Sequence, residues 1–114
     1  MSKFSFEKRE RLAKWPQFEH VINRGHKHNI ETFCTIFFLP NGLRRKRLGV
    51  IASKKIGNAV VRNQVKRKIR EVFRHIKNCI EPAMDVVVIS RRGLVSLPSK
   101  VLEKKISQFL PVKR

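Results

Sequence analysis

Acidic residues are scarce in this chain, which has 8 Asp and Glu against 27 Lys and Arg in 114 residues. A metal-dependent nuclease that works alone needs several carboxylates that converge on its metal ions, and these scattered acids form no such set. The four histidines fit surface or structural positions better than the position of a general base. The sequence therefore argues against an active site formed by protein alone.

Cysteines and long apolar runs are also few. Cys34 and Cys79 have no metal-ligand spacing, and we expect two buried, inert thiols. His26 and His28 have only Glu31 as a nearby companion, so no metal site is predicted there. No stretch approaches the roughly 20 apolar residues of a membrane span, and the charged N-terminus lacks the apolar segment of a signal peptide. We expect a cytoplasmic protein.

Positive charge is what the chain has in excess, with a formal net charge of +19. A nucleic acid is the expected partner, because its phosphates would neutralise these cations. Membrane binding is not expected, since the chain shows no long amphipathic or lipidated segment. Hydrophobic residues make up 41% of the chain, enough for one modest core. We predict a single domain over residues 1–114, with residues 1–14 as an irregular basic arm.

A basic helix with an apolar stripe is predicted to begin after Gly57 and Asn58. Gly permits unusual backbone angles, and Asn can cap the first free amides of the helix. At about 100° per residue, the apolar residues share one side: Val61, Val65, Ile69, Val72, Phe73 and Ile76. The cations gather on another side, with Lys68 on the opposite flank: Arg62, Lys66, Arg67, Arg70 and Arg74.

The cationic side of this helix is nearly free of compensating charge. Glu71 is the only acidic residue between Arg62 and Arg74, so cations at four-residue steps repel one another. A solvated helix surface usually mixes the two signs. The pattern therefore favours a surface that binds phosphates.

The remaining elements are predicted from periodicity and turn signals. We expect a first helix from Pro16 to Arg24, and strands over Ile30–Leu39 and Leu48–Ser53 that form an antiparallel hairpin. A third, central strand is expected over Met84–Ser90, because it is apolar on both faces. A last helix follows over Ser99–Leu110, with Ser96 or Ser99 as its cap and an apolar stripe of Val101, Leu102, Ile106, Phe109 and Leu110. The predicted fold is an α+β sandwich of order αββαβα.

The segment LGVIASKKIGNAVVRNQVKRKIREVFR resembles the signature of the bacterial ribonuclease P protein subunit. Gln64 departs from the pattern, because it replaces the second arginine of the family's Arg-Asn-Arg motif. The resemblance extends to Arg11 and Leu12 near the start and to Asp85 and Arg91 around the third strand. It implies a ribosomal-protein-like fold with a left-handed βαβ crossover.

The resemblance also implies a function. The family binds a large catalytic RNA, the ribonuclease P RNA, and promotes removal of the 5′ leader from precursor tRNA. The RNA performs the Mg²⁺-dependent hydrolysis, so the protein alone is expected to be inactive, to hold no metal and to need no obligate protein partner. The residues that match the family's RNA-binding pattern are Lys54, Lys55, Asn58, Arg62, Asn63, Lys66, Arg67 and Arg70, with Asn58 mainly a helix cap.

A second site is implied between the first helix and the sheet, where the family accepts the single-stranded leader. Such a site needs aromatic or apolar platforms for bases, beside cations. Phe18 is the best match, with plain core packing as the alternative. Ile22, Ile36 and Ser53 are the other candidates, and Ile22 stands where family members often carry an aromatic residue.

Three other functions fit parts of the sequence. A ribosomal or other structural RNA-binding protein fits the charge and the fold, but not the extended signature. A DNA-binding protein would use the basic helix in the major groove, yet no helix-turn-helix spacing accompanies it. A stand-alone nuclease would have to cleave precursor tRNA with protein and magnesium only.

Overall fold

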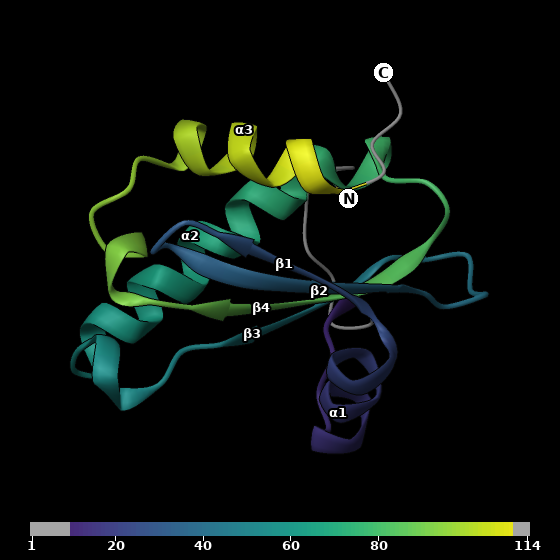
Figure 1. The fold of residues 1–114 in the computed structure, drawn as a ribbon, viewed down its shortest axis with the longest axis horizontal. Helices are drawn as coiled ribbons and strands as arrows, with labels where there is room; N and C mark the ends of the chain where they lie inside the picture. The colour runs from purple at the N-terminus through teal and green to yellow at the C-terminus, as the bar shows by residue number, and fades with distance from the viewer. Residues whose placement is uncertain (1–9, 111–114) are drawn as a thin grey trace.

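A four-stranded sheet with helices on both faces forms the protein (Figure 1). The structure, a computed structural model, describes residues 10–110. The helices are α1 (Trp15–Arg24), α2 (Ala59–Ile76) and α3 (Ser99–Phe109), and the strands are β1 (His26–Ile30), β2 (Cys34–Pro40), β3 (Arg47–Ile51) and β4 (Met84–Ser90). Short turns of 3₁₀ helix lie at η2 (Lys54–Ile56), η3 (Lys77–Cys79) and η4 (Arg92–Leu94).

The strand order is β1-β2-β4-β3, so the prediction that Met84–Ser90 is a central strand is confirmed. The antiparallel hairpin predicted between the strands over Ile30–Leu39 and Leu48–Ser53 is wrong, because β2 and β3 are not neighbours in the sheet. β3 pairs in parallel with β4, and α2 makes the crossover between them. The buried Asp85 carboxylate of β4 accepts hydrogen bonds from Arg47 at the start of β3 and from Asn41 in the loop before it. These contacts hold β3 beside β4.

A turn divides the segment that was predicted as one strand over Ile30–Leu39. Glu31 has φ 48°, and the Phe33 amide donates to the Ile30 carbonyl at 3.0 Å. The two halves, β1 and β2, then pair antiparallel. The element order is therefore αβββαβα rather than αββαβα. Glu31 itself takes the left-handed conformation that glycine usually takes in such turns, so the sequence has no glycine or proline here that would indicate a turn.

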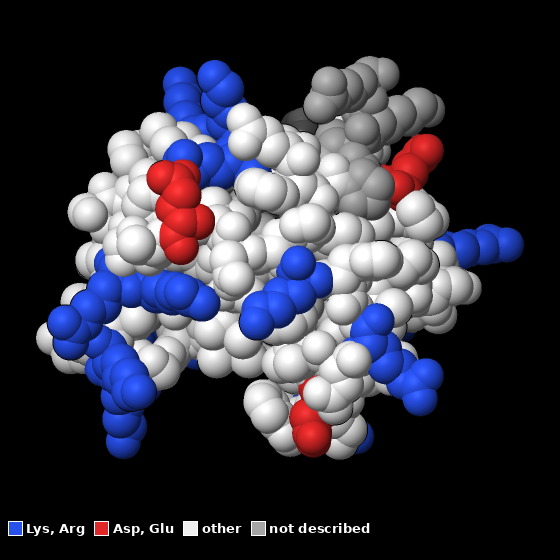
Figure 2. Space-filling view, viewed as in Figure 1, with Lys and Arg blue, Asp and Glu red and all other residues white. Residues whose placement is uncertain are grey.

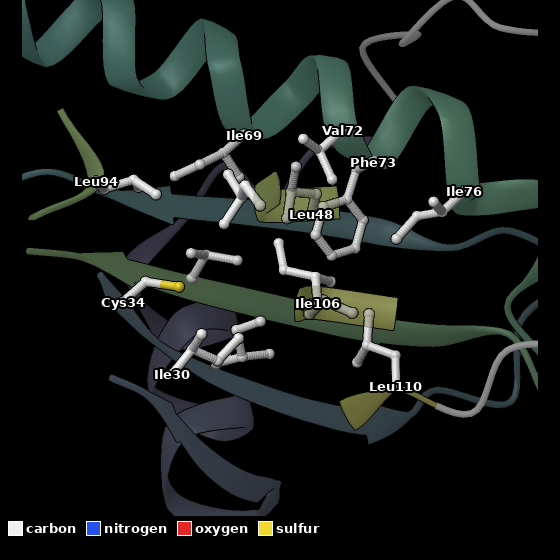
Figure 3. Close-up of a cluster of buried hydrophobic side chains, with 14 of the residues drawn as sticks. Ile30, Cys34, Leu48, Ile69, Val72, Phe73, Ile76, Leu94, Ile106 and Leu110 are labelled. Carbon is white, nitrogen blue, oxygen red and sulfur yellow. The ribbon is translucent and has the colours of Figure 1, made fainter. Parts of the chain in front are cut away.

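The main core lies between the sheet and helices α2 and α3 (Figure 3). The predicted apolar stripe of α2 is confirmed, because it is buried from Val65 to Ile76, while Val61 at its start is half-buried. On α3, Leu102 and Ile106 are buried but Val101 is exposed. The cap predicted for α3 is wrong: Pro98 precedes the helix, and no side chain caps it.

A smaller core lies on the opposite face of the sheet, under α1 (Figure 1). Val21 of α1 packs there with Phe37, Val87 and Leu12. The Leu12 amide donates to the Leu48 carbonyl at 2.9 Å, so this end of the predicted N-terminal arm is attached to β3. Residues 1–9 of that arm lie outside the described residues.

The two cysteines differ, although both were predicted to be buried. Cys34 is fully buried in the main core, and burial raises the pKa of its thiol to about 12. Cys79 is exposed in η3, because it lies past the last buried turn of α2. Only Cys34 is therefore an inert core thiol.

Candidate nucleic-acid interface

Helix α2 begins where the sequence predicted. The Asn58 side-chain oxygen accepts a hydrogen bond from the Val61 amide at 3.0 Å. Gly57 has φ 153°, and a Cβ there would lie 2.8 Å from Val61 Cβ, so both the angle and the space require glycine. With this start fixed, the buried stripe of α2 faces the sheet and its cations face outward.

The outward surface of α2, which we call the phosphate face, comprises Arg62, Asn63, Lys66, Arg67 and Arg70. Asn63 and Arg67 are exposed and the other three are half-buried. Within residues 10–110, Arg62, Lys66 and Arg70 form no ion pair. Arg74, which was predicted on the same side without compensation, instead lies with its Nη2 atom 3.9 Å from Glu71 Oε1.

Arg70 and Arg62 both lack a counter-charge in the described part of the chain. Burial lowers the pKa of Arg70, and the positive charge of Arg11 lowers it further. The Arg62 Nε atom is buried and has no hydrogen-bond partner. A bound phosphate would relieve both conditions, because it supplies negative charge and acceptor oxygens. Arg11 thus adds to the positive charge beside this face, a role that the sequence pattern did not indicate.

Lys68 is a cation of α2 that serves the fold instead. Its Nζ donates to the carbonyl oxygens of Leu94, Val95 and Leu97 at 3.0, 3.0 and 2.7 Å. Burial lowers its pKa. These bonds attach the segment before α3 to α2, so Lys68 stands apart from the phosphate face, on the flank where the helical projection placed it.

Lys54 and Lys55 lie on η2, not at the end of the preceding strand, because β3 ends at Ile51. Both are exposed, as is Ser53 just before them. The Arg92 Nε atom donates to the Lys55 carbonyl at 3.0 Å, which fastens η4 to η2. Figure 2 shows Lys and Arg side chains gathered at the lower left, in the region of η2 and the start of α2.

Phe18 of α1 rests on β3 through close contact with Gly49. A Cβ at Gly49 would lie 2.4 Å from Phe18 Cε1, so only glycine leaves room for the ring. Phe18 is half-buried, as are Ile22 of α1, Ile51 of β3 and Ile89 of β4 around the same small core. We call these four residues the α1-side patch.

Ile36 does not join this patch, although it was predicted to line the same site as Phe18. It is fully buried in the main core, on the α2 and α3 face of the sheet. Alternation along β2 explains the error, because neighbouring residues of a strand face opposite sides. Phe37, the next residue, is the one that packs in the small core under α1.

Polar groups near the patch come from β1, β2 and the end of β4. The Arg91 guanidinium donates to Thr35 Oγ1 at 2.9 Å and to Asn29 Oδ1 at 3.4 Å. Lys27 Nζ lies 6.0 Å from the centre of the Phe37 ring. The α1 side of the sheet therefore combines apolar side chains with cations, as a site for single-stranded RNA requires. Sequence reasoning missed this group, because its members meet only through the pairing of β2 with β1 on one side and with β4 on the other.

Comparison with known proteins identifies the family. The Ribonuclease P family model matches residues 6–112. The chain belongs to the ribonuclease P protein family. The ribonuclease P protein component of Caldanaerobacter subterraneus subsp. tengcongensis is 36% identical over 104 residues, which cover 91% of this chain and 89% of that protein. That of Desulfatibacillum aliphaticivorans is 36% identical over 109 residues, covering 96% and 92%.

Solved structures of ribonuclease P proteins share the fold. The Thermotoga maritima protein has a TM-score of 0.78 at 31% identity, covering 90% of this chain and 96% of that one. The Staphylococcus aureus protein has a TM-score of 0.76 at 31% identity, covering 87% and 90%. The resemblance seen in the sequence is thus confirmed over nearly the whole chain.

Membership of the ribonuclease P protein family identifies the reaction in which the chain takes part. The chain is the protein component of ribonuclease P, a tRNA-processing endoribonuclease whose catalysis is performed by its RNA subunit. Within residues 10–110 no three His, Cys, Asp or Glu side chains are grouped as metal ligands. No helix in that range is long and apolar enough to cross a membrane.

Proposed function

We propose that this ribonuclease P protein binds the catalytic RNA through the phosphate face and the 5′ leader of precursor tRNA through the α1-side patch. The cations of Lys54 and Lys55, and the capped start of α2 at Asn58, extend the phosphate face. Ser53, which was predicted with Phe18 for the leader site, is exposed just before η2. The RNA-centred active site uses Mg²⁺ to hydrolyse the phosphodiester bond, in the bacterial cytoplasm.

The uncompensated cations of α2 are the observation that carries this proposal. Three half-buried cations that have no ion pair within residues 10–110 favour an assembly with a polyanion, because phosphates remove their mutual repulsion. The placement of the helices supports two simultaneous contacts. Helix α2 packs on one face of the sheet and α1 on the other, so each partner can have its own side of the protein.

Leader cleavage at low magnesium tests the proposal. A precursor tRNA would be incubated with a bacterial ribonuclease P RNA, with and without this protein. We expect strong stimulation only when RNA and protein are both present, and no cleavage by the protein with magnesium alone. Intact RNA binding without stimulation would instead support a purely structural RNA-binding role.

Phe18→Ala is expected to weaken leader recognition without disturbing assembly. Stacking of a base on an aromatic side chain is worth about 1–3 kcal/mol. The preference of the assembled enzyme for precursor over mature tRNA should fall about tenfold. Binding of the ribonuclease P RNA should stay unchanged, because Phe18 lies on the face of the sheet opposite α2. An unaltered preference would leave Phe18 as a core residue only.

A further inference from the structure

Trp15, the only tryptophan of the chain, is unusually exposed for its size. It is the first residue of α1 and is 58% exposed. By contrast, every phenylalanine within residues 10–110 is buried or half-buried. An exposed tryptophan leaves a large apolar surface in water, which is unfavourable unless a partner covers it. This side chain contributes little to either core.

The Trp15 ring extends the aromatic surface that Phe18 begins. The two ring centres are 6.0 Å apart and the ring planes differ by 16°. Phe18 is itself fixed by its contact with Gly49. Together the rings form a stacked pair that runs outward from the sheet along the start of α1.

The start of α1 is held in place by its own side chains. The Gln17 Oε1 atom accepts hydrogen bonds from the amides of Ala13 and Lys14, at 2.9 and 3.1 Å. Pro16 restricts the backbone of the first turn. Trp15 is therefore presented from an ordered backbone, which lowers the entropy lost when a ligand stacks on it.

The charge around Trp15 selects the class of ligand. The first turn of α1 has no acidic residue and Lys14 is exposed beside it, while the exposed Glu19 follows one turn after Trp15. The net charge of +19 favours an anionic partner. A polymer that carries both negative charge and flat aromatic rings is a single-stranded nucleic acid, whose bases stack on tryptophan irrespective of sequence.

We infer that Trp15 stacks one unpaired base of the precursor leader, next in line beyond the base at Phe18. This inference rests on the proposed function, because it adds a second platform to the α1-side patch. Trp15 then sets how far along the leader the protein makes contact. A leader too short to reach Trp15 gains nothing from it, whereas a longer leader gains one additional stacked base.

Intrinsic fluorescence tests this directly, since all tryptophan emission of the chain comes from Trp15. The protein assembled with ribonuclease P RNA would be titrated with mature tRNA and with precursors whose leaders grow by one nucleotide. We expect the emission to be quenched only above a threshold leader length. Equal emission with mature tRNA and with every precursor would overturn the inference.

Affinity measurements with Trp15→Ala and Trp15→Phe give a second test. Trp15→Ala should raise the Kd for leaders above the threshold about tenfold and leave shorter leaders unaffected, while Trp15→Phe should retain most of the affinity. Val101→Ala, which truncates an exposed apolar residue of α3, serves as the matched control and should change neither. A Trp15→Ala protein with wild-type affinity for all leaders would contradict the inference.

The outcomes also separate this inference from the proposed function. If Phe18→Ala lowers leader preference and Trp15→Ala does not, the Trp15 platform is refuted while the proposed function stands. If the wild-type protein shows no preference for precursor over mature tRNA, the proposed function fails first. Quenching that depends on protein concentration without any RNA would assign the exposed ring to contact between copies of the chain and overturn the inference.

Discussion

The double variant Lys66→Ala/Arg70→Ala should bind ribonuclease P RNA about a hundredfold more weakly than the wild-type protein. Both side chains belong to the phosphate face, are half-buried and have no ion pair in the part of the chain that the structure describes. A hydrogen bond to a charged group contributes about 1.5–3 kcal/mol, so the loss of two such contacts produces an effect of this size. The slope of log K against log salt should become shallower by about 1.4–1.8, since each lost phosphate contact removes about 0.7–0.9. Filter binding at several salt concentrations measures both quantities.

Lys100→Ala/Lys104→Ala is the matched control for this variant. It also removes two cations four residues apart on a helix, and both lysines are exposed on α3. The net charge of the two variants is therefore the same, and only the position of the loss differs. If both variants weakened binding equally, the total charge and not the phosphate face would determine the affinity.

Asp85→Ala should lower the free energy of unfolding by about 3–5 kcal/mol, because it leaves a partly buried arginine without its partner. The Asp85 carboxylate accepts bonds from Arg47 Nε and Nη2 at 2.8 and 2.7 Å and from Asn41 Nδ2 at 2.8 Å. The bond to Asp85 is also the main cause of the raised pKa of Arg47. In a domain of about 100 residues, a loss of this size lowers Tm by more than about 10 °C, because each kcal/mol corresponds to about 4–8 °C. Thermal unfolding followed by circular dichroism measures it.

Glu71→Ala provides the control for the Asp85 substitution. It also deletes one carboxylate that faces an arginine, but Glu71 Oε1 and Arg74 Nη2 are 3.9 Å apart and the two side chains are 46% and 41% exposed. An exposed pair of this kind contributes about 1 kcal/mol or less, so the Tm should change little. A similar Tm for both variants would show that the Asp85 network does not anchor β3 to β4.

Local patterns in the sequence predicted the helices and the central strand well, but not the pairing of the strands. The apolar stripe of α2 and its cap at Asn58 depend on residues within one or two turns, so they can be recognised without the fold. The position of β3 depends on Asp85, which lies 38 residues beyond Arg47 in the chain. The turn at Glu31 has no glycine or proline that would announce it. Both features depend on tertiary contacts.

The candidate interface likewise has one part that local sequence patterns predict, the phosphate face, and one part that depends on tertiary contacts, the α1-side patch. The four cations of the phosphate face were predicted from helical spacing, because one helix carries them, whereas Asn63 was named only by the family resemblance. The α1-side patch draws on α1, β3 and β4, and there the sequence misplaced Ile36 and did not indicate Ile51 or Ile89. Family resemblance named Phe18, but the packing of its ring on Gly49 becomes visible only when α1 and β3 are brought together.

The position of β4 also affects how the protein is made. Within the described sheet β4 is the only neighbour of β3 and joins it to β2, yet it is the last strand to leave the ribosome. Residues 59–76 emerge before the strand against which their apolar stripe packs. Until residue 90 has left the ribosome, the emerged part of the nascent chain carries an exposed polycation with an uncovered hydrophobic side. Synthesis therefore passes through an interval in which ribosomal RNA, the nearest polyanion, competes with folding for this segment.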